Sequence, residues 1–332
     1  MPRLGQQHFR ISGTGSYLPQ AIVRAEEMDR RLNKPLGYVA STGGVLTRHE
    51  CRAPETLTSM AIAAALRATE AASLQLSDLD LIIDASTCRH QPIPCNAALL
   101  AQALGMDVKG VPAFDIQSTC LGFIVAVQVA NGLFATGNYE HILVVCSESL
   151  LAGVNYSEPE SSALMGDGAG AVVLSRSAPR NTFAYSHETH AEHSAICEVR
   201  GGSHNLPPFE YDPSKEGLYR FHMDGPELFR VARKLLPPMV ERLLQETQVD
   251  RNSLQIIPHQ ASPRGVEAIR RSLSVGTDTF HNRTPEIGNL AAASIPVMLD
   301  WFRRRVEFTH PTLAMLLGTS AGYSQAAMIL EV

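Results

Sequence analysis

The 332-residue sequence contains no run of about 18 apolar residues, the length that a membrane-spanning helix requires. Its N-terminus also lacks an apolar segment long enough for a signal peptide. The six cysteines are scattered and form no CxxC pair, which predicts free thiols in a reducing compartment. From these absences we expect a cytoplasmic protein that does not enter a membrane.

Charge of one sign is not concentrated anywhere in the chain. The formal net charge is -5, and charged residues make up 18% of the sequence. Because no basic block is present, the sequence argues against general nucleic-acid binding. Hydrophobic residues make up 45%, enough for the core of one large domain or of two fused modest ones.

Short apolar segments alternate with longer helical patterns, which predicts an α/β architecture. The expected strands are residues 81–83, 111–117, 141–146, 169–174, 254–257, 313–317 and 325–330. The expected helices are residues 97–104, 121–136, 226–245, 263–273 and 291–305. Residues 1–177 and 178–332 give similar sets of elements and have no low-complexity linker between them. We expect two tightly packed halves, although no sequence repeat establishes a duplication.

Cys120 has a setting that favours chemistry, because it lies between an expected strand and an expected buried helix. A cysteine at a helix N-terminus feels the positive end of the helix dipole, which lowers its pKa and favours the thiolate. The backbone N–H groups there point toward the oxygen of a bound acyl group, and Gly122 leaves room for substrate. On location alone, a buried structural cysteine explains Cys120 equally well.

His259 and Asn289 are two further candidates. His259 directly follows the expected strand 254–257, and strand ends commonly hold catalytic groups in α/β proteins. Taken alone, His259 is a core residue and Asn289 an ordinary helix N-cap. In one pocket with Cys120, they would supply two neutral donors for a developing oxyanion beside a nucleophile.

Six segments, in this order along the chain, carry a resemblance to a known family. They are GTGSYLP (13–19), AFD (113–115) leading to CLGF (120–123), MGDGAGAVVL (165–174), MDG (223–225), PHQA (258–261), and GN (288–289) with AASIP (292–296). With this ordered set the chain resembles the β-ketoacyl-acyl-carrier-protein synthase III family, the initiating condensing enzymes of fatty-acid synthesis within the thiolase superfamily.

The resemblance implies a thiolase fold, a duplicated α-β-α-β-α five-layer sandwich, in a homodimer. It implies that Cys120 holds an acyl group, while His259 and Asn289 bind a malonyl thioester that loses carbon dioxide and attacks it. The product is a 3-oxoacyl thioester of fatty-acid or secondary metabolism. The backbone N–H groups of Cys120 and Ser320 would form the oxyanion hole. No metal or cofactor is implied, since the substrates are coenzyme A or phosphopantetheine thioesters.

The resemblance also assigns residues to substrate and partner binding. Ser262, Arg264 and Ile93 match positions that contact pantetheine or shape the acyl pocket, with Ile93 reaching across the dimer. Arg230, Arg264 and Arg271 match basic positions that meet an acidic acyl-carrier protein. The Trp and Arg with which the family clasps coenzyme A are replaced here by Gly37 and Ser41, so the acyl donor is either acyl-CoA held differently or an acyl-carrier protein.

Two alternatives to this function stay open. A relative of the same fold would transfer the acyl group to a hydroxyl or amine without decarboxylation, and an inert homologue would serve as a partner subunit.

Two further patterns favour structure over ligand binding. The glycines of 166–170 lack the Lys-Ser/Thr of a phosphate loop and predict a tight turn. His187, His190 and His193 are spaced for one helix face but predict a solvated surface, not a metal site.

Overall fold

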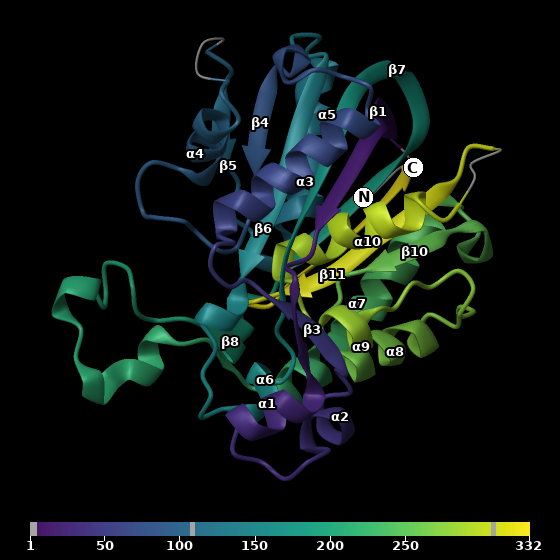
Figure 1. The fold of residues 1–332 in the computed structure, drawn as a ribbon. Helices are drawn as coiled ribbons and strands as arrows, with labels where there is room; N and C mark the ends of the chain where they lie inside the picture. Colours follow the sequence, from purple (N-terminus) through teal and green to yellow (C-terminus); the bar gives the residue numbers. More distant parts are fainter. Residues whose placement is uncertain (1–4, 107–109, 307–309) are drawn as a thin grey trace.

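In a computed structural model, the described residues 5–106, 110–306 and 310–332 build one large mixed sheet with helices on its outer faces and in its interior (Figure 1). The strand order is β10-β11-β12-β7-β6-β4-β5, and β1 also pairs with β7. These strands are β1 (Gly5–Tyr17), β4 (Leu81–Asp84), β5 (Ala113–Asp115), β6 (His141–Ser149), β7 (Asp167–Thr189), β10 (Gln255–Pro258), β11 (Leu313–Ser320) and β12 (Ser324–Glu331). Two small sheets pair β2 (Ala21–Arg24) with β3 (Thr47–Glu50) and β8 (Cys197–Glu198) with β9 (His222–Met223).

The longer helices pack in the three largest hydrophobic clusters found among the described residues. One outer cluster joins the sheet to α3 (Leu57–Ala71) and α4 (Asn96–Ala103). The other joins it to α7 (Gly225–Thr247) and α8 (Pro263–Ser272). The central cluster contains α5 (Gly122–Ala135) and α10 (Ser294–Arg303), with strand residues from both halves of the chain. The short helices are α1 (Ala25–Arg31), α2 (Tyr38–Thr42), α6 (Pro159–Ser162) and α9 (Thr284–Ile287).

Strand periodicity explains this layering. Successive side chains of a strand point to opposite faces. Accordingly, Ile256 and Met315 join the α7–α8 cluster, while their neighbours Ile257 and Leu316 join the central one. Two helical layers outside, two sheet layers and one helical layer between them give the expected five-layer arrangement.

The strand β7 belongs to both sheet layers. Its first part pairs with β6 and β1, with Asp167 opposite Ser149, and its last part pairs with β12, with Thr189 opposite Ser324. The expected boundary between residues 177 and 178 therefore falls inside a continuous strand.

The turn expected at residues 166–170 is wrong, because Asp167 to Gly170 already belong to β7. Close approach explains these glycines: a Cβ on Gly166 would lie 2.5 Å from the Ile287 carbonyl oxygen, and one on Gly170 would lie 2.7 Å from the Val297 nitrogen. The helix expected at 291–305 is also divided, into the 3-10 turn η9 (Ala291–Ala293) and α10.

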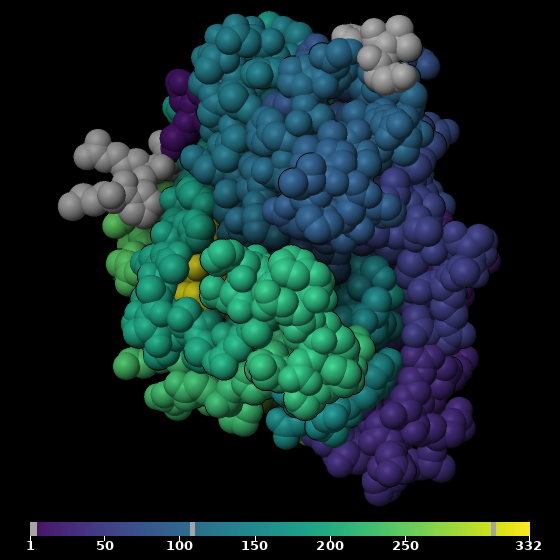
Figure 2. Space-filling view, turned by 90° about the vertical axis from the view of Figure 1, so that its left-hand side faces the viewer, coloured from purple at the N-terminus to yellow at the C-terminus, as the bar shows by residue number. Residues whose placement is uncertain are grey.

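One segment, residues 199–220, projects from the body of the molecule (Figure 1), and it comes forward in the space-filling view (Figure 2). It contains the short turns η6 (Pro208–Glu210) and η7 (Pro213–Tyr219) and exposes Phe209 almost fully. Among the described residues, we find no helix whose length and apolarity would let it cross a membrane.

Candidate active site

Cys120 lies in η3 (Thr119–Leu121), a single turn directly before α5. Thr119 has a left-handed backbone, with φ of 46°, which is uncommon for a residue with a side chain and is frequent at functional sites. Cys120 keeps partial exposure as a residue, but burial of its sulfur and, to a smaller extent, the nearby Glu148 carboxylate together raise the pKa of the thiol to about 12. Hydrogen bonds from the backbone N–H groups of Ala321 and Cys120 act in the opposite direction.

The expected lowering of the Cys120 pKa is therefore wrong for the unliganded site. Desolvation disfavours the charged thiolate more strongly than the helix start favours it. The Cys120 side chain is therefore a thiol near pH 7, and a nucleophilic role would require that its proton be removed.

His259 follows the last residue of β10 and is only 4% exposed. Its backbone N–H donates to the Leu317 carbonyl of the neighbouring strand β11 at 2.7 Å. The next residue of β11, Gly318, lies so close that a Cβ there would be 2.6 Å from the His259 Cβ. Burial lowers the pKa of His259 to about 4, so the imidazole is neutral near pH 7, and its buried Nδ1 has no hydrogen-bond partner in the described structure.

Asn289 is 8% exposed and is fixed on both sides of its backbone. Its N–H donates to the Leu164 carbonyl at 2.7 Å, and its carbonyl accepts from the Gly166 N–H at 2.9 Å. The side-chain Oδ1 accepts from the Ala291 N–H at 2.8 Å, which forms an Asx turn; the N-cap position of η9 is Leu290, so Asn289 is not the helix N-cap that its local pattern predicts. This bond orients the carboxamide, because it assigns Oδ1 to the backbone and leaves the NH2 group as the donor end.

Packing brings these three residues into one region. The η3 turn of Cys120 packs against β11, which neighbours His259, and against η9, which begins two residues after Asn289. One half of the chain thus supplies the thiol, and the other supplies the imidazole and the carboxamide.

The other predicted residues are more dispersed. Ser320 ends β11 and directly precedes Ala321, whose N–H faces the sulfur. Ser262 caps α8, where its Oγ accepts from the Gly265 N–H at 3.1 Å. Ile93 lies after β4 and is 83% exposed.

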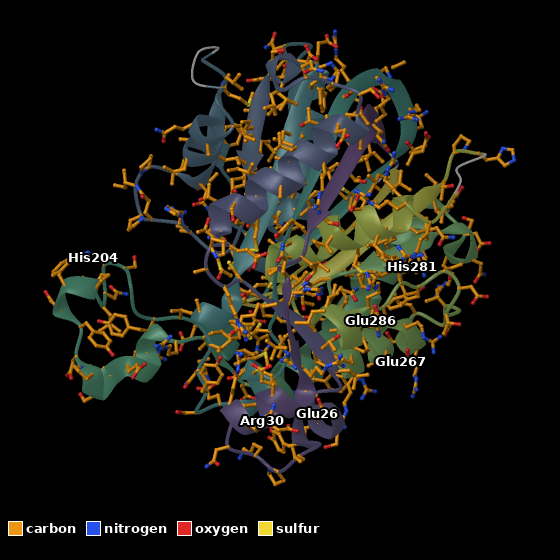
Figure 3. The ribbon with its side chains drawn as sticks, in the orientation of Figure 1. Glu26, Arg30, His204, Glu267, His281 and Glu286 are labelled. Atoms are coloured by element: carbon orange, nitrogen blue, oxygen red, sulfur yellow. The ribbon has the colours of Figure 1, made fainter. Side chains whose placement is uncertain are left out.

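The three predicted docking arginines lie on α7 and α8. Arg230 and Arg271 form ion pairs with glutamates of their own helices, Glu227 and Glu267 (Glu267 is labelled in Figure 3). Arg264, at the start of α8, donates to the Ser41 carbonyl at 2.5 Å. Ser41, one of the two residues that replace the coenzyme A clasp of the family, therefore accepts a hydrogen bond from Arg264, a residue predicted to bind the carrier protein.

Glu148 is a functional candidate that the sequence analysis missed. It is fully buried near the end of β6, where its carboxylate accepts the Thr87 N–H at 2.7 Å and the Cys88 N–H at 2.9 Å. Burial raises its pKa to about 7. An available signal was its position as the one acidic residue in the otherwise apolar and small segment 142–149.

The histidines considered above do not share a helix face. His187 lies in β7, His190 follows that strand, and His193 lies in the irregular turn η5 (Ala191–Ile196). Across the described ranges, no group of three or more His, Cys, Asp or Glu side chains is arranged to hold a metal ion.

Comparison with known proteins gives matches along the chain. A family profile described as 3-Oxoacyl-[acyl-carrier-protein (ACP)] synthase III matches residues 114–191, and one described as its C terminal matches residues 244–332. Beta-ketoacyl-[acyl-carrier-protein] synthase III of Vesicomyosocius okutanii is 32% identical over 323 residues, covering 97% of this chain and 98% of the relative.

Solved structures give the same fold. The 3-oxoacyl-[acyl-carrier-protein] synthase III of Aquifex aeolicus has a TM-score of 0.86 at 28% identity, covering 98% of this chain and 100% of that one. The priming beta-ketosynthase of the R1128 polyketide biosynthetic pathway has a TM-score of 0.88 at 26% identity, covering 100% and 98%.

Proposed function

The chain belongs to the β-ketoacyl-[acyl-carrier-protein] synthase III family, and we propose that Cys120, His259 and Asn289 carry out its reaction. It is an acyltransferase of the thiolase fold that condenses an acyl group with a malonyl thioester to give a 3-oxoacyl thioester. The observation that supports these three roles is the convergence of a thiol, a neutral imidazole and an oriented carboxamide from separate segments.

The first half of the reaction moves an acyl group onto Cys120. The sulfur attacks the carbonyl carbon of an acyl thioester, a new S–C bond forms, and the donor's C–S bond breaks. Neutral His259 takes the thiol proton and passes it to the leaving thiolate of coenzyme A or the carrier. In our proposal the backbone N–H groups of Cys120 and Ser320 stabilise the tetrahedral oxyanion. The Ala321 N–H hydrogen-bonds to the Cys120 sulfur and so stabilises the thiolate.

The second half forms the carbon–carbon bond. His259 and Asn289 donate hydrogen bonds to the thioester carbonyl of the malonyl group while its carboxylate leaves as carbon dioxide. The electron pair of the bond between the malonyl α-carbon and the carboxylate forms an enolate. The enolate carbon attacks the acyl carbon, the bond from that carbon to the Cys120 sulfur breaks, and the released thiolate regains a proton. Each donor to such an oxygen is typically worth about 10²–10³ in rate. Both steps balance without a metal or cofactor, so we propose that none is needed.

The donor-binding surface is proposed to involve Arg230, Arg264 and Arg271 with an acyl-carrier protein, and Ser262 and Arg264 with pantetheine. Basic side chains on α7 and α8 suit an acidic partner through electrostatic steering. We further propose a cytoplasmic homodimer with Ile93 at the partner's acyl pocket, because the isolated chain leaves this apolar side chain exposed. The division into halves between residues 177 and 178 is likewise a proposal, and so is the alternative that the enzyme acts in secondary metabolism instead of fatty-acid biosynthesis.

The decisive experiment combines decarboxylation with acyl mapping. The protein is incubated with carboxyl-labelled malonyl thioester and a panel of acyl-CoA and acyl-carrier-protein donors, and released carbon dioxide is counted. Intact-protein and peptide mass spectrometry locate the acyl group. We expect one acyl group on Cys120 and acyl-dependent release that Cys120→Ala abolishes. Acylation at another residue, or condensation by Cys120→Ala, would refute the assignment.

A further inference from the structure

Glu148 lies on the side of β6 that faces the η9 and η3 turns, and its charge acts on the Cys120 thiol. Alternate residues of β6 face opposite sides, and Val144 and Cys146 belong to the central cluster while Val145 belongs to the outer one. Glu148 continues the inward set, on the side where η9 packs against β6 and η3 packs against η9. Its partner across the ladder is Gly168, which places no side chain beside the carboxylate.

In the part of the chain that the structure describes, no basic side chain is among the main influences on the pKa of Glu148. Its two oxygens accept backbone N–H groups from the turn after β4, and the Cys88 thiol also hydrogen-bonds to it. The facing titratable groups are Asp84 of β4, Cys88 of the turn, Cys146 of β6 and Cys120 of η3. The η9 turn is all alanine, and no ion pair among the described residues includes Glu148.

We propose that Glu148 is a positioning residue that keeps the proton on Cys120 until an acyl donor is bound. This inference rests on the proposed nucleophilic role of Cys120. A carboxylate beside the sulfur raises the free energy of the thiolate, but it has no such effect on the neutral sulfur of an acyl-cysteine. Glu148 therefore makes the neutral acyl-cysteine more stable relative to the free thiolate. Because it also keeps the thiolate population low, it protects the empty site from other electrophiles. The thiolate that does form is more nucleophilic, because nucleophilicity rises with thiol pKa.

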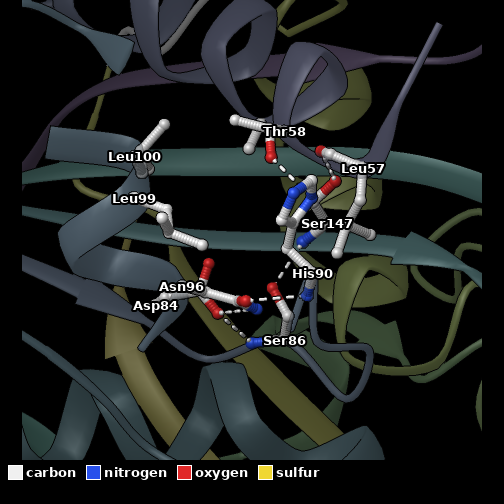
Figure 4. A pocket seen from close by; sticks show the side chains of 10 residues that line it. Leu57, Thr58, Asp84, Ser86, His90, Asn96, Leu99, Leu100 and Ser147 are labelled. Carbon is white, nitrogen blue, oxygen red and sulfur yellow. Dashed lines mark hydrogen bonds between the residues drawn. The ribbon is translucent and has the colours of Figure 1, made fainter. Parts of the chain in front are cut away.

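The turn that Glu148 contacts is also held from the opposite face of the sheet, which makes a charge-removing variant practicable. A small pocket there is lined by Asp84, Ser86, Asn96 and Ser147 (Figure 4). The Ser86 N–H donates to Asp84 at 3.0 Å, the Ser147 N–H donates to the Ser86 Oγ at 2.9 Å, and Asn96 donates to the Cys88 carbonyl at 2.9 Å. These bonds remain when Glu148 becomes Gln.

The test is the pH dependence of Cys120 alkylation by iodoacetamide, followed by peptide mass spectrometry. In Glu148→Gln we expect the ionisation of Cys120 to move to lower pH by about one unit. Labelling at pH 8 should then be about threefold faster, because a roughly tenfold larger thiolate fraction is partly offset by the lower nucleophilicity of that thiolate. Glu148→Asp keeps the charge and should stay close to wild type. Asp167→Asn is the matched control: Asp167 is a buried carboxyl of the adjacent strand β7 that accepts backbone N–H groups from Leu151 and Cys51.

The results separate an electrostatic role from a structural one. A Glu148→Gln profile that coincides with wild type, or an equal shift in Asp167→Asn, would overturn the proposal. Thermal unfolding checks that each variant is folded. The wild type provides a second measurement if Glu148→Gln does not fold: ionisation of Glu148 should flatten the rise of log rate between about pH 6 and 8, and a slope of one throughout would contradict us. Alkylation requires no acyl transfer, so this outcome is independent of the carbon dioxide assay.

Discussion

Gly318→Ala should disable the site without touching a reacting group. The new Cβ would lie 2.6 Å from the His259 Cβ, whereas carbon atoms rest at about 3.5–4.0 Å. His259 would have to retreat by about 1 Å, although its N–H is tied to the Leu317 carbonyl in the same strand pair. A displacement of this size typically costs about 10² in rate. Overpacking should lower the free energy of unfolding by about 1–3 kcal/mol.

The assay is acyl-dependent carbon dioxide release, with thermal unfolding measured in parallel. Gly132→Ala is the matched control, because a Cβ on this glycine of α5 meets nothing within 4 Å. As a glycine inside a helix, it should gain about 1 kcal/mol of stability on becoming alanine, with no change in rate. Wild-type release by folded Gly318→Ala would refute the idea that this contact sets the position of His259.

Three further predictions concern chemistry and partners. Burial lowers the pKa of His259 to about 4, and in the proposed mechanism the protonated ring is inactive. Carbon dioxide release should therefore stay level from about pH 8 to 5 and decline only as pH falls toward 4. A decline already between pH 7 and 6 would contradict a buried neutral imidazole. Asn289→Ala should slow release by about 10²–10³ while iodoacetamide still labels Cys120 at the wild-type rate; equal loss of both would indicate a collapsed site. The Arg271 side chain is 74% exposed, and Arg271→Glu should raise KM for carrier-borne substrates by about fivefold at low salt and by less at high salt. The control is Arg200→Glu on the projecting segment, where the side chain is 58% exposed; this variant should not change KM. Equal KM values for the two variants would exclude docking at α8.

The sequence was informative where local chemistry and position coincide. Cys120 between strand and helix, and His259 after a strand, are visible as patterns, and the structure places both at element ends. Most expected strands and helices are confirmed within a few residues, because apolar periodicity reflects burial on a particular face.

Other features depend on contacts between distant segments. The pKa of Cys120 is set mainly by burial and by Glu148 of strand β6. Neither effect can be predicted from the position of Cys120 at the start of a helix. The glycines before and within β7 have the sequence pattern of a turn. In the structure they are needed because segments distant in sequence pack so closely that a Cβ would collide with their backbone. The candidacy of Asn289 came from the resemblance to a family, because its local sequence pattern predicts only an ordinary helix cap.

The continuity of β7 limits how this enzyme can be recombined. Residues 167–189 run unbroken through both sheet layers and are locked in register with β1 and β6 on one stretch and β12 on the other. A chimera that takes Cys120 from one relative and His259 and Asn289 from another must have its crossover between residues 120 and 259, a range that contains all of β7. One strand thus connects the half that carries Cys120 with the half that carries His259 and Asn289. If either half is exchanged, the new segment must still pair with β7 in the same register.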